Sequence, residues 1–168
     1  NTTDTSEGCA VDSAKTNIII RSLIATATPT SQTICSGDTT SIVLTGSLPG
    51  TTFAWEIAGI GVVGAFADED SIIAQVLTAI DSIAGTLIYT ITPTAGLCVG
   101  LPIFDTVTVN PIPTITATAG SQTLCSGDST SIVLASNVAG TTFSWTVVQT
   151  GVSGASAGTD SIITQTLT

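Results

Sequence analysis

Residues 31–44 read SQTICSGDTTSIVL, and residues 121–134 read SQTLCSGDSTSIVL. The similarity continues on both sides of this stretch. Residues 27–78 align with residues 117–168 without a gap, at a shift of 90 residues, and 31 of the 52 aligned positions are identical. A fixed period of this length is typical of repeat architectures, in which each repeat is one structural unit. The unit of about 90 residues is close in size to an immunoglobulin-like β-sandwich.

The repeat divides the chain into parts. Cys9 precedes Cys35 by 26 residues and Cys98 precedes Cys125 by 27, so the start of the chain follows the same pattern. We expect residues 1–26 to be the tail of a preceding unit, residues 27–116 to be a complete unit, and residues 117–168 to be the first part of the next. That last part lacks a counterpart to 79–116, which downstream chain or another subunit would supply.

The complete unit is a series of short β-rich segments separated by turn residues. The expected strands are 31–35, 40–46, 51–57, 70–78, 86–93 and 105–110. The turn at 36–38 predicts a hairpin of the first two strands. Period-two alternation places Phe53, Trp55 and Ile57 on one face. We expect Phe53 and Trp55 and their copies Phe143 and Trp145 to be core rather than ligand-binding aromatics. The predicted fold class is all-β, with tandem immunoglobulin-like β-sandwich repeats.

The charge balance excludes several functions. The formal net charge is −10, and Lys15 and Arg21 are the only basic side chains. Nucleic-acid binding and docking on an anionic membrane both need clusters of Lys and Arg, so we expect neither. The apolar windows contain glycines and polar residues, which argues against membrane insertion. The sequence has no His, the commonest general base, and no Ser lies near an activating Lys. We expect no enzymatic activity.

Four segments carry a resemblance to a known family: TICSGDTTSIVL (33–44), PGTTFAW (49–55), YTITPTAGLC (89–98) and DTVTVNPIP (105–113). They resemble the PKD-like and immunoglobulin-like repeats of giant surface proteins of Bacteroidetes-type bacteria, including gliding-motility adhesins. The resemblance implies secretion, a tandem array and either display of an adhesive tip or contact along the array. It implies no shared catalytic residues and no cofactor.

We therefore predict a non-enzymatic extracellular stalk or fibre on the bacterial surface. Its partners would be neighbouring repeats or identical subunits, with carbohydrate or other surface ligands as further possibilities. One alternative is a pilus-like filament subunit, in which strand complementation by another subunit completes the last unit. Another is a spacer module of a secreted hydrolase, which would place the chemistry elsewhere.

The four cysteines recur at fixed spacing, which in a secreted protein suggests disulfides. The first hypothesis is an intradomain bond between Cys35 and Cys98. It requires an altered first strand, because the usual sandwich order puts those two loops at opposite ends of the domain. The competing hypothesis joins the turn of one unit to the loop of the next. The partners of Cys9, Cys35, Cys98 and Cys125 would then all lie outside this sequence.

Two patterns of acidic residues suggest further sites. Asp68 and Asp70 are weak candidates for structural Ca²⁺, and the second copy keeps only the latter acid. Eight of the nine aspartates are followed directly by Ser or Thr. This resembles the Asp-Ser/Thr-aliphatic acceptor motif of O-glycosylation in Bacteroidetes-type bacteria, so covalent O-glycans are expected. The candidate acceptors are Ser13, Thr39, Ser71, Ser82, Thr106, Ser129 and Ser161.

Overall fold

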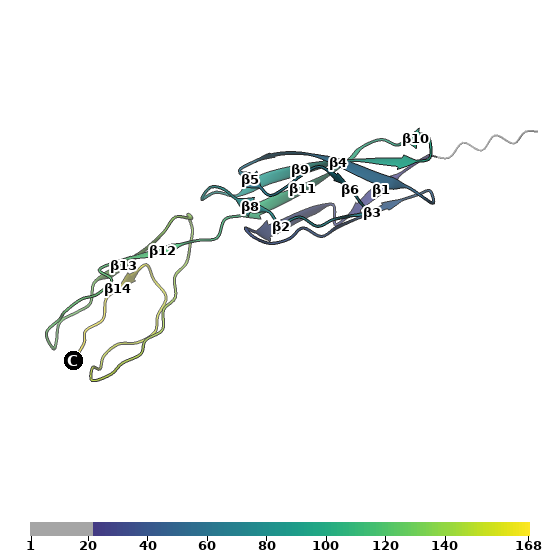
Figure 1. Ribbon diagram of the computed structural model, residues 1–168. Helices are drawn as coiled ribbons and strands as arrows, with labels where there is room; N and C mark the ends of the chain where they lie inside the picture. The colour runs from purple at the N-terminus through teal and green to yellow at the C-terminus, as the bar shows by residue number, and fades with distance from the viewer. Residues whose placement is uncertain (1–21) are drawn as a thin grey trace, which may run out of the picture.

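The structure is a computed structural model that describes residues 22–168. Within that range the chain contains strands and no helix. It forms two bodies that follow one another along a line, as Figure 1 shows. The first body, called the middle unit below, contains the strands from β1 to β11. The second body, the C-terminal unit, contains β12, β13 and β14.

One sheet of the middle unit has three strands. They are β1 (Ala25–Thr28), β3 (Ile42–Gly46) and β7 (Ile72–Ile73), and both pairings are antiparallel. The strands alternate between buried and exposed residues, as expected for a sheet with one face in the core. Ile42 lies opposite Ile73, and both side chains are fully buried.

The other sheet of the middle unit is larger. Its strand order is β2 (Ser31–Cys35), β11 (Ile103–Asn110), β9 (Gly85–Ala95), β4 (Thr52–Ile60) and β6 (Asp68–Glu69), and β10 (Cys98–Val99) pairs with β9. All of its pairings are antiparallel except that of β2 with β11, which is parallel. A separate two-stranded ribbon joins β5 (Val62–Val63) to β8 (Thr78–Ala79).

The hairpin predicted for residues 31–46 is wrong, because β2 and β3 belong to different sheets. The chain crosses between the sheets at Gly37, whose φ of 93° lies in the region that favours glycine. The Asp38 carboxylate accepts a hydrogen bond from the Cys35 N–H at 3.0 Å, which closes the turn. The Gln32 side chain bonds to both the N–H and the C=O of Ser41 and so replaces a strand partner there.

The two sheets face each other across one hydrophobic core, which confirms the predicted β-sandwich class. Its buried apolar residues come from both sheets: Ala25, Ala27, Ile42, Leu44, Phe53, Trp55, Ile73, Leu77, Leu87, Tyr89, Ile91, Val107 and Val109. All of them belong to the middle unit. The middle unit therefore has a core of its own. Burying each large apolar side chain in it contributes about 1.5–3 kcal/mol to the stability of the unit.

The C-terminal unit repeats one sheet of the middle unit. Its strands are β12 (Ile115–Thr118), β13 (Ile132–Ser136) and β14 (Ile162–Ile163). The register is the same: Ile132 lies opposite Ile163, as Ile42 lies opposite Ile73. The inward-facing residues of β13 and β14 are only half-buried and all of β12 is exposed, because no strands corresponding to β9 and β11 cover this sheet within residues 115–168.

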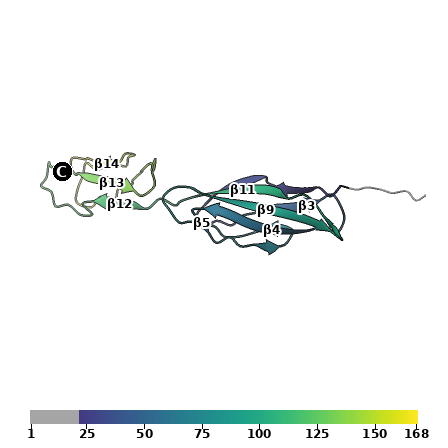
Figure 2. The ribbon, with the colours of Figure 1, turned by 90° about the horizontal axis from the view of Figure 1, so that it is seen from above.

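The chain enters and leaves the middle unit at opposite ends, which Figure 2 shows from above. At the leading end, the carbonyl oxygens of Ser22 and Ile24 accept hydrogen bonds from Ser47, and β1 begins directly afterwards. At the trailing end, Asn110 ends β11 beside the turn that follows β2, and its carbonyl oxygen accepts a bond of 2.8 Å from the Ser36 N–H. Residues 111–113 then lead to the C-terminal unit.

Candidate functional site

Two of the aromatic residues singled out in the sequence lie in the core of the middle unit, and their two copies lie at the same positions of the C-terminal unit. Phe53 and Trp55 are buried, with 5% and 4% of their surface exposed, which supports a core role for both. The Trp55 indole N–H donates to the carbonyl oxygen of Phe66 at 3.1 Å, so its polar atom is satisfied internally. Phe143 and Trp145 occupy the same positions in the C-terminal unit and are half-buried. None of the four forms an exposed ring platform for a ligand.

A buried polar cluster in the middle unit is not anticipated from the sequence. Gln75 lies between the two sheets, and its side-chain oxygen accepts bonds from the Tyr89 hydroxyl at 3.0 Å and from the Phe66 N–H at 3.3 Å. Its amide nitrogen donates to the Phe66 carbonyl at 2.8 Å. Thr40 accepts a bond from the Gln75 N–H and donates one to Ile73. Each buried polar group of this cluster has a hydrogen-bond partner. We therefore interpret the cluster as structural, with hydrogen bonds that hold the two sheets together.

Burial also changes the acidity of Tyr89. It raises the pKa of the phenol to about 12. A hydrogen bond with Thr40 lowers that pKa somewhat, and the nearby carboxylate of Asp105 raises it again. The phenol therefore stays protonated at every physiological pH, which keeps it a hydrogen-bond donor to Gln75.

Asp105 differs from these buried polar residues, because its side chain has no hydrogen-bond partner among residues 22–168. It lies on β11 opposite Tyr89, its side chain is fully buried, and neither carboxylate oxygen has a hydrogen-bond partner within the described residues. Burial raises the pKa of this carboxyl from 3.8 to about 6. A sequence signal for this residue does exist, because alternation places it on the same face as Val107 and Val109.

The cysteines of the middle unit lie at its two ends. Cys35 ends β2 and lies opposite Asn110 at the trailing end. Cys98 begins β10, which pairs with the last residues of β9 near the leading end. The eight residues of β11, from Ile103 to Asn110, separate the two ends, which corresponds to about 23 Å of extended chain. A disulfide needs Cα atoms roughly 4.4–6.8 Å apart.

The expected intradomain Cys35–Cys98 bond is therefore wrong. The two thiols are exposed and free, as is that of Cys125 in the C-terminal unit. The physical reason is the parallel pairing of β2 with β11, which carries Cys35 away from the leading end. Cys9 lies outside the described residues.

Most of the described O-glycan acceptor candidates are accessible. Exposed candidates are Thr39, Ser71, Ser82, Ser129 and Ser161. Thr106 differs, because it is only half-exposed and lies within β11, which is paired on both sides. Thr106 is therefore less accessible in the folded unit than the five exposed candidates. Ser13 lies outside the described residues.

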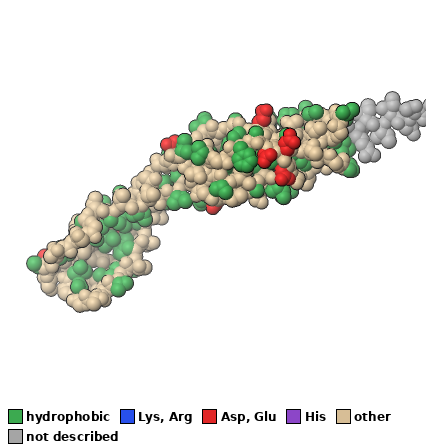
Figure 3. Space-filling view, viewed as in Figure 1, with side chains coloured by type: hydrophobic (Ala, Val, Ile, Leu, Met, Phe, Trp, Pro, Cys, Tyr) green, Lys and Arg blue, Asp and Glu red, His purple; other side chains and the backbone are tan. Residues whose placement is uncertain are grey.

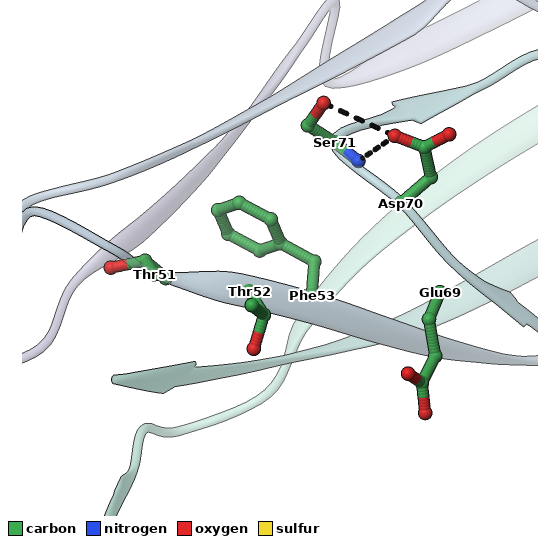
Figure 4. Close-up of a pocket in the computed structure, with 6 residues that line it drawn as sticks. All are labelled: Thr51, Thr52, Phe53, Glu69, Asp70 and Ser71. Atoms are coloured by element: carbon green, nitrogen blue, oxygen red, sulfur yellow. Dashed lines mark hydrogen bonds between the residues drawn. The ribbon is translucent and has the colours of Figure 1, made fainter. Parts of the chain in front are cut away.

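The acidic stretch at residues 68–70 borders a shallow hollow of about 260 Å³. Figure 4 shows the side chains that line it, with Phe53 at its centre and Glu69 pointing away from Asp70. The Asp70 carboxylate bonds to the backbone N–H and hydroxyl of Ser71, and Asp68 bonds to the next N–H. Among residues 22–168, no group of three or more His, Cys, Asp and Glu side chains is placed to hold a metal ion. The calcium hypothesis gains no support.

The surface carries little charge for its size. The described residues include no Lys or Arg, and Figure 3 shows a few acidic groups among isolated apolar side chains. Several apolar residues are largely exposed, including Ile60, Leu97 and Leu101. No helix within residues 22–168 is long and apolar enough to cross a membrane.

Comparison with known proteins finds a family match within the middle unit. Residues 32–113 match the family model of the PKD-like domain. The matched segment runs from β2 through β11 and includes strands of both sheets of the sandwich, but it leaves out β1. This match supports the expected identification of the middle unit as a PKD-like, immunoglobulin-like repeat. The chain has no match among curated proteins.

Proposed function

We propose that the chain is part of a non-enzymatic, extracellular array of immunoglobulin-like repeats that serves as a stalk or adhesive fibre. The observation that carries the proposal is the position of the two ends of the middle unit. The chain enters beside Ser47 and leaves beside Cys35, at opposite ends of the same sandwich. Units joined in this way extend in a line, so each added repeat adds length.

The dimensions of the unit suit a spacer. The longest strand, β9, has 11 residues, which corresponds to about 36 Å. The linker contains Pro111 and Pro113 in three residues, and prolines restrict the bending of a short linker. A run of such units would carry a binding site far from the cell surface. The sequence resemblance supports a Bacteroidetes-type bacterial surface as the setting.

Small-angle X-ray scattering of the chain tests this arrangement. Two units in line span at least about 75 Å and give a radius of gyration of about 22 Å or more. A compact chain of 168 residues would give about 15 Å. A matched variant with Pro111→Gly and Pro113→Gly should broaden the distance distribution while both units stay folded. A radius near the compact value would refute the linear array.

The described residues give no support for catalysis. The buried carboxylate of Asp105 has no hydroxyl or thiol within hydrogen-bonding distance, so it activates no nucleophile. The exposed thiols of Cys35 and Cys98 lie at opposite ends and share no pocket. These features fit a structural role, which depends on the length and the surface of the array, better than they fit catalysis.

O-linked glycans are part of the proposal. The exposed acceptors Thr39, Ser71 and Ser82 follow aspartates on the surface of the middle unit. Sugars there would solvate a surface with few charges and would shield strand edges from pairing with other chains. The intact mass of the native protein, measured before and after chemical removal of O-linked sugars, tests this. An unchanged mass would remove the glycans from the proposal.

A second candidate is a filament in which another subunit completes the C-terminal unit. It is favoured by the half-buried Phe143 and Trp145 and by a hollow of about 330 Å³ beside Leu124 and Leu167. Two strands resembling β9 and β11 would cover this face. Light scattering distinguishes the candidates, because strand complementation gives concentration-dependent oligomers. A monomer at all concentrations would leave only the linear array.

A further inference from the structure

The loop that carries Cys98 packs against the linker at the leading end. Gly100 lies two residues after Cys98, and its N–H donates to the Pro93 carbonyl at 2.8 Å. A Cβ added to Gly100 would lie 3.1 Å from Cγ of Leu23, so the loop backbone is in direct contact with Leu23. By the 90-residue repeat, Leu23 corresponds to Pro113 in the next linker. The Cys98 loop therefore lies against the segment that connects its unit to the preceding one.

The turn that carries Cys35 flanks a linker from the other side. Cys35 lies opposite Asn110, and the next residue in the turn bonds to the Asn110 carbonyl at 2.8 Å. From Asn110 to Pro113 the chain advances three residues, or at most about 11 Å. In a continuous array, the turn of one unit and the loop of the following unit thus meet around the same three-residue linker.

We propose that each junction of the array is closed by a disulfide between the Cys35-type thiol of one unit and the Cys98-type thiol of the next. This inference rests on the proposed linear array. Both thiols are exposed and free in the middle unit, and the distance along β11 prevents them from pairing with each other. The turn cysteine recurs as Cys125 at the same place, where the Cys125 N–H again bonds to an aspartate, Asp128, at 3.0 Å.

The bond forms by thiol–disulfide exchange. One thiolate attacks an external disulfide oxidant, such as oxidised glutathione, and releases one reduced thiol. The second protein thiolate then attacks the mixed disulfide, which forms the S–S bond and releases the other reduced thiol. The two protein thiols lose two protons and two electrons, and the oxidant gains them. A covalent clamp around each linker would keep neighbouring units in line and would carry tension past the proline segment.

The test uses the full chain, extended after Thr168 by a second copy of residues 79–113, which completes the C-terminal unit. Cys9→Ser and Cys125→Ser leave three thiols: Cys35, Cys98 and the appended copy of Cys98. After equilibration with oxidised and reduced glutathione, peptide mapping should join Cys35 to the appended cysteine and leave Cys98 reactive to maleimide. The matched Cys35→Ser variant should leave both remaining thiols reactive.

Two results would overturn the proposal: a Cys35–Cys98 bond, or three thiols that stay reactive while circular dichroism shows both units folded. If the extended chain does not fold, non-reducing peptide mapping of the protein from its source decides. There, Cys35 must be joined to a peptide from another unit. X-ray scattering of the same sample distinguishes a failure of the disulfide proposal from a failure of the linear array. An elongated chain whose thiols stay free would contradict the junction disulfide and leave the linear array standing.

Discussion

The buried carboxylate of Asp105 makes a sharp prediction about stability. It lies in the core with no hydrogen-bond partner for either oxygen within the described residues. Ionisation in such a place is costly, which is why burial raises the pKa of this group to about 6. We predict that Asp105→Asn abolishes a pH dependence of folding that the natural chain shows. The amide has nearly the same shape and cannot ionise.

The sign follows from proton binding. Between pH 3.8 and about 6, the folded state holds the proton and the unfolded state has lost it, so the free energy of unfolding falls as the pH rises. The contribution is fully present below the unfolded pKa and is lost as the pH passes the folded pKa. A shift from 3.8 to about 6 corresponds to about 3 kcal/mol. At pH 7 the variant gains less than this, because its buried amide N–H groups cost about 1–3 kcal/mol.

Urea denaturation between pH 4 and 7 measures the effect. A Trp145→Phe background leaves Trp55 as the only tryptophan, so fluorescence reports on the core of the middle unit alone. The natural chain should lose about 2.4 kcal/mol more than Asp105→Asn over this range, because part of the full effect falls below pH 4. The matched control Asp81→Asn, at an exposed position, should leave the slope unchanged. Equal slopes for the natural chain and Asp105→Asn would refute the raised pKa assigned to this buried carboxyl.

Three further predictions concern other parts of the unit. Tyr89→Phe removes a buried donor and should lower the free energy of unfolding by about 1–2 kcal/mol, which urea denaturation would detect and an unchanged midpoint would contradict. Gly85→Ala should destabilise the middle unit strongly, because the new Cβ would lie 2.5 Å from a backbone carbonyl oxygen, whereas Gly120→Ala meets nothing within 4 Å and should be nearly neutral. In the native host, Ser82→Ala should lower the intact mass by one glycan, whereas Thr106→Ala should leave the number of glycans unchanged. Loss of a glycan from Thr106→Ala but not from Ser82→Ala would mean that glycosylation precedes folding.

Most of the longer strands and the core were predictable because they depend on short-range pattern. The single strand expected at 70–78 is wrong, because the structure has two short strands there, β7 and β8. Alternation placed Phe53, Trp55 and Ile57 on one face, and the structure has Phe53 and Trp55 in the core. Ile57 is 38% exposed, because the buried part of β4 ends at Trp55. The partner of β2 was not predictable in the same way. A turn with Gly37 fits a hairpin as well as a crossing between sheets, and the choice depends on β11, about 70 residues further along the chain. The error in the cysteine pairing follows from that single strand.

The buried polar residues show a different limit of sequence reasoning. Gln75 lies in a strand pattern between Ile73 and Leu77, so alternation correctly puts it on the inner face. Nothing in the pattern tells which donors and acceptors will surround it. Its partners Tyr89 and Phe66 come from other segments and meet it only in the folded sandwich. Asp105 presents the same pattern and receives no partner within the described residues, a contrast that only the three-dimensional arrangement reveals.

The recurrence of residues between the two copies separates the needs of the fold from the needs of the array. Thr130 and Gln165 repeat the interior hydrogen bonds of Thr40 and Gln75, so folding alone explains why they recur. The turn cysteine has no such explanation, because its thiol is exposed and free in both units. Its backbone N–H makes the bond to the turn aspartate, which any residue except proline could make. A thiol that contributes nothing inside its own unit is best explained by a role outside it, and the junction is the surface that this turn faces.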